Sequence, residues 1–135
     1  NKGWNYYVFL QRKQGNARRE NGQFYSNFAY FRLEKKWNEK WNTALEYTHM
    51  NYLSKQPGGL TDALFARDPQ ISLRSRNWFS INWNLFAFHL NYKISNHISL
   101  NTRIFSLLAN RSSLGVLNRI NEFDNPQNNR NLIQG

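Results

Sequence analysis

The chain has 135 residues, of which 40% are hydrophobic, 16% are aromatic and 19% are charged, and its formal net charge is +10. A content of 5 Trp, 7 Tyr and 10 Phe excludes a disordered basic tail, because such tails are poor in the aromatic residues that build a core. The absence of cysteine excludes a disulfide scaffold, a thiolate zinc site and a cysteine nucleophile, and no run of about 18 apolar residues forms a transmembrane helix.

Apolar and polar residues alternate with a period of two along most of the chain, which predicts β-strands. In the first of them, Trp4, Tyr6, Val8 and Leu10 share one face. Four further segments repeat the alternation. The predicted strands cover about residues 4–13, 24–37, 41–52, 77–93 and 98–109.

The apolar positions of the fourth strand change phase in its middle. Apolar residues stand at odd positions from Phe79 to Trp83 and at even positions from Phe86 to Tyr92. A slip of one residue is what an inserted residue produces. We therefore predict a β-bulge near Asn84 or Leu85.

Long and short connections alternate between the predicted strands. Residues 15–23, 53–76 and those from 110 onward are long, whereas 38–40 and 95–96 are tight turns. Outer-membrane β-barrels have this plan, and their strands need about 9 to 11 residues to cross the bilayer, whereas soluble strands usually have about five or six. The pattern predicts an all-β fold, an antiparallel up-and-down segment of a transmembrane β-barrel with about five long strands, tight periplasmic turns and long extracellular loops.

Aromatic residues stand at both ends of these strands. Barrels place such residues in a girdle at each boundary between hydrocarbon and water. The alternative is that they cover the ends of a soluble β-sandwich core. The predicted girdle residues are Trp37, Trp41 and Tyr92 near the tight turns, and Tyr25, Tyr52 and Trp78 near the long loops.

The loop at residues 53–76 contains the helical signals of the chain. Pro57-Gly58-Gly59 predicts a turn, and Thr61 is placed to cap a helical turn over residues 62–67. Asp68-Pro69 ends it, because a residue before proline avoids the helical region. Such a helix can form a lid over a pore, or it can be a filler that packs its apolar residues against neighbouring loops.

The run from Gln56 to Gln70, together with Ser72, Arg74, Arg76 and Asn77-Trp78-Phe79, resembles the TonB-dependent outer-membrane receptors. Within that family the run is most similar to receptors of the ferric dicitrate type. The resemblance covers essentially the whole chain, and its specific part is residues 53–79. It implies a 22-stranded barrel with a globular plug, which imports ferric chelates with energy delivered through TonB.

The resemblance also implies a location and partners. We expect the outer membrane of a Gram-negative bacterium, with its lipid and lipopolysaccharide as partners, TonB acting through the plug, a ferric chelate as substrate, and no nucleic acid. The chain begins at Asn1 without methionine or a signal-peptide core. We therefore expect the plug, the TonB box and most strands to lie outside these 135 residues, so that this partial barrel does not transport alone.

The positive charge is concentrated in the long loops. A basic mouth attracts anionic solutes, and guanidinium groups bind carboxylates through paired hydrogen bonds. The candidate ligand-binding residues are Arg67, Gln70, Arg74 and Arg76, with the last two expected to point at a pore mouth. Alternatively, the loop cations pair with lipopolysaccharide phosphates or keep the surface solvated.

No catalytic motif is present, and we expect neither an enzyme, a bound cofactor nor a metal site. Glu34 and Glu46 are expected to face inward from paired strands, where salt bridges to Arg32 and Lys36 are favoured over an acid/base pair. We interpret His89 as a lumen or bulge residue.

Two other functions compete with ferric chelate transport. A soluble basic β-domain could bind single-stranded nucleic acid by stacking bases on Tyr and Trp, although the aromatic residues here stand at strand ends and the basic ones in loops. A passive porin shares the strand pattern without coupling to TonB.

Overall fold

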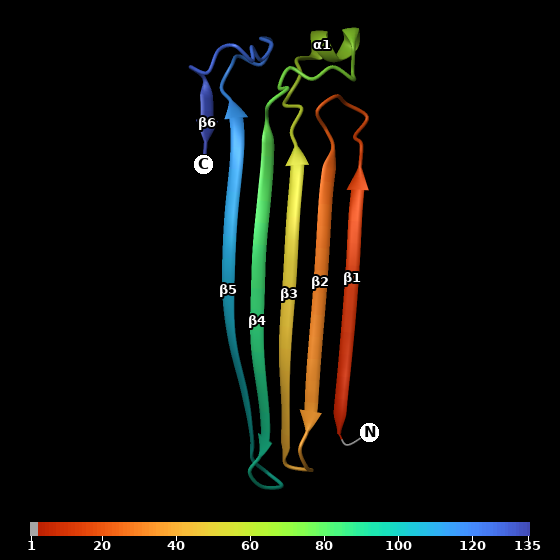
Figure 1. Cartoon of the computed structure of the whole chain (residues 1–135), viewed down its shortest axis with the longest axis vertical. Helices are drawn as coiled ribbons and strands as arrows, with labels where there is room; N and C mark the ends of the chain where they lie inside the picture. Colours follow the sequence, from red (N-terminus) through yellow and green to blue (C-terminus); the bar gives the residue numbers. More distant parts are fainter. Residues whose placement is uncertain (1–2) are drawn as a thin grey trace. The chain divides into compact units, whose positions relative to one another are not determined.

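The computed structural model describes residues 3–135. These residues form one sheet with the strand order β1-β2-β3-β4-β5-β6, so that each strand lies beside the next one in the sequence (Figure 1). The predicted all-β, antiparallel, up-and-down architecture is confirmed, and the sheet of the described residues is not closed. The elements are β1 Trp4–Gly15, β2 Phe24–Lys36, β3 Trp41–Lys55, α1 Asp62–Arg67, β4 Trp78–Lys93, β5 Ser99–Val116 and β6 Leu132–Gln134.

The last predicted strand is longer in the structure, and a sixth strand follows it. β5 reaches Val116 instead of ending at residue 109. The polar run after Ala109 had suggested a loop, but its backbone is paired: Ser113 and Gly135 exchange two hydrogen bonds of 2.7 and 3.2 Å. The register continues with Leu114 opposite Gln134. β6 has three residues, and so short a strand cannot be recognised from the alternation of apolar and polar residues.

The predicted β-bulge near Asn84 or Leu85 is wrong. Lys93 donates its backbone N–H to the carbonyl of Lys40, and the rings of Tyr47 and Phe86 pack with centroids 4.8 Å apart. His49 Nδ1 lies 2.9 Å from Asn84 Oδ1. Beyond them, Gln56 donates its backbone N–H to the Asn77 carbonyl, so the spacing between the Lys40–Lys93 and Gln56–Asn77 pairs is the same on both strands and no residue is inserted. With no inserted residue, Phe79, Ile81 and Trp83 lie on the opposite face of β4 from Phe86 and Phe88. On the face of Phe86, Asn84 accepts a hydrogen bond of 2.7 Å from the Tyr47 hydroxyl.

The chain divides into two compact units. The first, which contains both tight turns and is called the turn unit below, comprises Asn1–Gln11, Asn27–Met50 and Trp83–Ala109. The second, the loop unit, contains the long loops and comprises Arg12–Ser26, Asn51–Asn82 and Asn110–Gly135. Among the described residues, the buried hydrophobic side chains are Ala44 in the turn unit and Leu73 and Val116 in the loop unit.

The predicted helix is present as α1. The Thr61 hydroxyl accepts a hydrogen bond from the backbone N–H of Leu64, and Asp68 donates its backbone N–H to the Leu64 carbonyl at the other end. Asp62 in the first turn and Arg67 in the last both suit the helix dipole. Phe65 is exposed, which does not fit the filler alternative. Of the helices within residues 3–135, none is long and apolar enough to cross a membrane.

Candidate functional site

Arg74 lies buried in the loop unit without a carboxylate partner in the described residues. Its Nη1 donates to the carbonyls of Leu73 and Glu122 at 3.0 and 2.7 Å. Its Nη2 donates to the carbonyls of Asn118 and Arg119 at 2.8 and 3.0 Å. A buried cation is tolerated when its hydrogen-bonding groups are satisfied, and here four backbone oxygens do so. Arg74 therefore holds the loop at 117–131 against its own loop.

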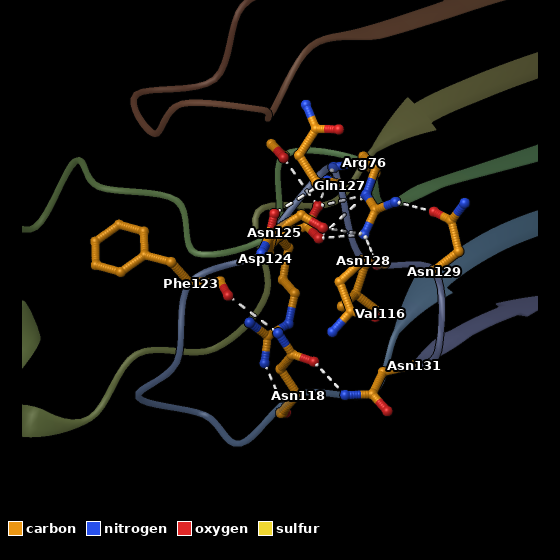
Figure 2. Close-up of polar contacts among 12 residues, drawn as sticks. Arg76, Val116, Asn118, Phe123, Asp124, Asn125, Gln127, Asn128, Asn129 and Asn131 are labelled. Atoms are coloured by element: carbon orange, nitrogen blue, oxygen red, sulfur yellow. Dashed lines mark hydrogen bonds and ion pairs between the residues drawn. The ribbon is translucent and has the colours of Figure 1, made fainter.

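Arg76 binds the same third loop through Asp124 (Figure 2). Its Nε lies 2.9 Å from Asp124 Oδ2 and its Nη2 lies 2.6 Å from Oδ1, a paired geometry that is stronger than a single hydrogen bond. Ser75 adds a hydrogen bond of 2.9 Å to the same carboxylate. The Arg76 guanidinium also reaches the carbonyls of Asn125 and Asn128. Its donors are thus directed into the third loop.

The carboxylate of Asp124 is held in its ionised form. Its side chain is 1% exposed. The hydrogen bond from Arg76 is the largest cause that lowers the pKa of Asp124, with burial opposing it and Ser75 assisting. A buried acid with a lowered pKa needs its cation in place, so Arg76 and Asp124 form one structural element.

Arg19 connects the first long loop to the second. Its Nη1 donates to the Gly58 carbonyl at 2.6 Å and its Nη2 donates to the Ile71 carbonyl at 3.0 Å. Nearby, the Asn21 side-chain amide donates to the carbonyls of Asn77 and Arg74. Together, Arg19, Arg74 and Arg76 bind all three long loops, and we call these three residues the arginine clamp.

The predicted ligand residues separate into two pairs. Arg74 and Arg76 belong to the clamp and point into loop carbonyls and Asp124, whereas we had expected them to point at a pore mouth. Arg67, at the end of α1, and Gln70 are exposed. The Gln70 carbonyl accepts a hydrogen bond of 3.0 Å from the backbone of Glu20. The clamp was not foreseen, because sequence patterns do not show which arginines meet backbone oxygens.

One face of the turn unit carries an ionic network. Arg32 contacts the carboxylates of both Glu34 and Glu46, and Asn42 donates to Glu34 at 2.6 Å. His89 Nε2 lies 3.3 Å from Glu46 Oε2, without good hydrogen-bond geometry. The expectation that Glu34 and Glu46 share a face and bind Arg32 is confirmed, whereas Lys36 forms no ion pair with either of them among the described residues.

The opposite face of the turn unit is apolar and uncovered. Tyr6 is 79% exposed, Leu10 73% and Ile104 62%. Residues of four strands come together on this face around a depression of about 400 Å³, including Phe31, Leu45, Tyr47, Phe86, Phe88 and Ile104. In the turn unit, the network of Arg32, Glu34 and Glu46 and these apolar side chains therefore lie on opposite faces, and the network residues are the less exposed set.

The predicted girdle residues lie in both units. In the turn unit, Trp41 and Tyr92 stack with centroids 4.0 Å apart, and the Trp37 indole donates to Thr43 at 2.9 Å. In the loop unit, Tyr52 packs edge-on against Phe79 with centroids 6.3 Å apart. Tyr25 is exposed, and Trp78 lines a cleft with Lys55.

Comparison with known proteins gives no match: no family model, curated protein or solved structure is significantly similar to the chain.

Proposed function

We propose that this chain is a wall segment of a membrane-spanning β-barrel in the outer membrane of a Gram-negative bacterium. The observation that carries the proposal is the sorting of side chains in the turn unit, where the apolar face is exposed and the ionic network of Arg32, Glu34 and Glu46 occupies the other face. A barrel wall needs this arrangement, because its outside meets lipid and its inside meets water. In water, an uncovered apolar face of this extent would promote association.

Strand length supports the same proposal. β1 to β5 have 12, 13, 15, 16 and 18 residues. Each exceeds the roughly 9 to 11 residues that a tilted strand needs to cross the hydrocarbon layer. Soluble strands are usually about half as long, since five or six residues already span a small domain.

The sheet edges require further strands in lipid. β1 pairs with β2 alone, and β6 covers the far edge of β5 at Leu114–Val116. Each unpaired backbone N–H or C=O in hydrocarbon costs several kcal/mol. About eight strands are needed before a barrel interior is wide enough to be filled by side chains. The functional barrel therefore contains more strands than the six described here.

We further propose that this barrel is a TonB-dependent receptor that imports a ferric chelate of the citrate type. This part rests on the resemblance of residues 56–79 to that family. The arginine clamp supports it indirectly, because it joins three long loops into one body on which a ligand surface can be built. Within that surface, Arg67 and Gln70 are the predicted ligand residues with exposed side chains.

The membrane proposal is tested by refolding the chain in nonionic detergent and in detergent-free buffer. We expect strand-rich circular dichroism and a monodisperse particle in detergent alone. A monodisperse, strand-rich monomer without detergent would contradict the proposal. Binding of a labelled single-stranded oligonucleotide at low salt would instead favour the nucleic-acid alternative.

The transport proposal is tested in cells that carry the complete gene. Uptake of labelled ferric dicitrate should require both this gene and TonB. Uptake that persists without TonB identifies a passive porin. If a strain that lacks the gene grows unchanged on ferric dicitrate as its iron source, ferric dicitrate is excluded as the substrate.

A further inference from the structure

A cleft of about 490 Å³ lies at the two tight turns of the turn unit. Three lysines line it, Lys36, Lys40 and Lys93, and Glu39 is the carboxylate among its described lining residues. Most of the other polar lining side chains are amides and hydroxyls, among them Asn42. A volume of this size accommodates a small molecule.

Hydrogen bonds fix both turns that border the cleft. In the first, the Asn38 side chain accepts from the backbone N–H groups of Lys40 and Trp41 at 2.8 and 3.0 Å. In the second, Ile94 and Ser95 both donate to the Ile98 carbonyl. The lysines therefore stand on a preorganised frame, which lowers the entropic cost of holding a ligand.

Two of the three lysines, Lys40 and Lys93, are placed to repel each other. Lys93 donates its backbone N–H to the Lys40 carbonyl at 2.9 Å, so these two lysines are cross-strand neighbours. Like charges directly opposite each other destabilise a strand pair. Within residues 3–135, no carboxylate lies within ion-pair distance of Lys36, Lys40 or Lys93. A bound anion would remove this repulsion.

Asn42 provides the cleft with a hydrogen-bond acceptor that has no donor. Its amide nitrogen is used by Glu34 at 2.6 Å, and its Oδ1 is buried without a hydrogen-bond partner. A buried acceptor without a partner costs free energy that a ligand hydroxyl can recover. The cleft therefore combines three cationic donors with one acceptor.

We propose that this cleft binds a small multivalent oxyanion that carries a hydroxyl group, the chemistry of hydrogen phosphate. The ammonium groups of Lys36, Lys40 and Lys93 neutralise the charged oxygens, and Asn42 Oδ1 accepts a hydrogen bond from the hydroxyl group. The site lies wholly within the turn unit and does not depend on the proposed transport function.

The experiment titrates inorganic phosphate into the whole chain, folded in nonionic detergent at pH 7 and low ionic strength, and follows binding by calorimetry. We expect saturable binding with a dissociation constant of about 1 mM. Lys93→Gln should weaken it about tenfold, since it removes one ammonium group from the neighbourhood of a divalent anion. The matched control is Lys13→Gln, which removes one charge in the loop unit and should leave binding unchanged.

A second measurement keeps the test informative. The repulsion predicts that Lys93→Gln melts at a higher temperature than the wild type without phosphate, and that phosphate raises the melting temperature of the wild type more than that of the variant. Lys40→Gln serves in its place if that variant does not fold. The proposal is overturned if folded wild type shows no saturable binding, if chloride at equal ionic strength has the same effect, or if Lys13→Gln weakens binding as much as Lys93→Gln.

Discussion

Arg32 of the turn unit and Arg74 of the loop unit are used in opposite ways. In the turn unit, Arg32 is partly exposed and contacts the carboxylates of Glu34 and Glu46. In the loop unit, Arg74 is buried and contacts four backbone carbonyls. The first arrangement joins regular strands whose backbone is already paired in the sheet. The second supplies hydrogen bonds to backbone carbonyls of irregular loops, which have no neighbouring strand to pair with.

This difference teaches where the molecule depends on single side chains. A strand that loses a surface ion pair keeps its ladder of backbone hydrogen bonds. A loop that loses its guanidinium leaves partly buried carbonyl groups without that partner, and a fully buried group in this position costs about 1 to 3 kcal/mol. Substitutions should therefore have larger effects in the clamp than in the ionic network.

Arg74→Ala should cause the largest loss. We expect the free energy of unfolding to fall by about 4 kcal/mol, since several partly buried carbonyls lose their donor and the buried Arg74 side chain leaves a space beside Leu73. Denaturant unfolding in detergent measures it. Arg74→Lys is the matched control: it keeps the charge but lacks the planar fork, and we expect it to recover at most half of the loss. Full recovery by lysine would show that charge, and not geometry, is what the site requires.

Asp124→Asn should have the next largest effect, confined to the loop unit. Amide hydrogen exchange of residues 117–131 should become at least about tenfold faster, because charged hydrogen bonds to Arg76 are lost. Exchange in the turn unit should not change. Equal acceleration in both units would show that the two do not open separately.

The same pair predicts a dependence on pH. Asp124 has a folded-state pKa below its unfolded value of about 3.9, so its stabilisation is fully present above that value and is lost as the pH falls through the folded pKa. The wild-type loop should therefore loosen in acid, below about pH 4. Asp124→Asn should lack this step, and hydrogen exchange measured at several pH values distinguishes the two.

Gly58→Ala should have an intermediate effect. Gly58 has a φ of +75°, a backbone conformation that alanine rarely adopts. An added Cβ would also lie 2.7 Å from Cγ of Arg74, whose guanidinium is held by the loop carbonyls to which it donates. We expect a loss of about 1 to 2 kcal/mol. Gly115→Ala is the control, since nothing lies within 4 Å of its added Cβ. A loss at Gly115 equal to that at Gly58 would contradict a local clash.

The sequence predicted the strands well because alternation is repeated over more than ten residues in each. It also predicted the Thr61 cap, since capping depends on adjacent residues. It failed near Asn84, where the apolar residues of β4 change from one face of the strand to the other and so imitate a bulge. The failure at Arg74 and Arg76 has another cause. Their partners lie in a loop more than 40 positions away, and no local pattern encodes that distance.

Glu46→Gln tests the weaker side of the comparison. Glu46 lies between Arg32 and His89, and all three side chains are partly exposed, so solvent screens the charges. We expect the free energy of unfolding to fall by roughly 0.5 to 1 kcal/mol, because glutamine keeps the shape and one acceptor oxygen. Arg32→Met should cost no more than about twice as much, since the strand ladder remains. If either variant equals Arg74→Ala in denaturant unfolding, then the ionic face stabilises the sheet as strongly as the clamp stabilises the loops, and the contrast between the two units does not hold.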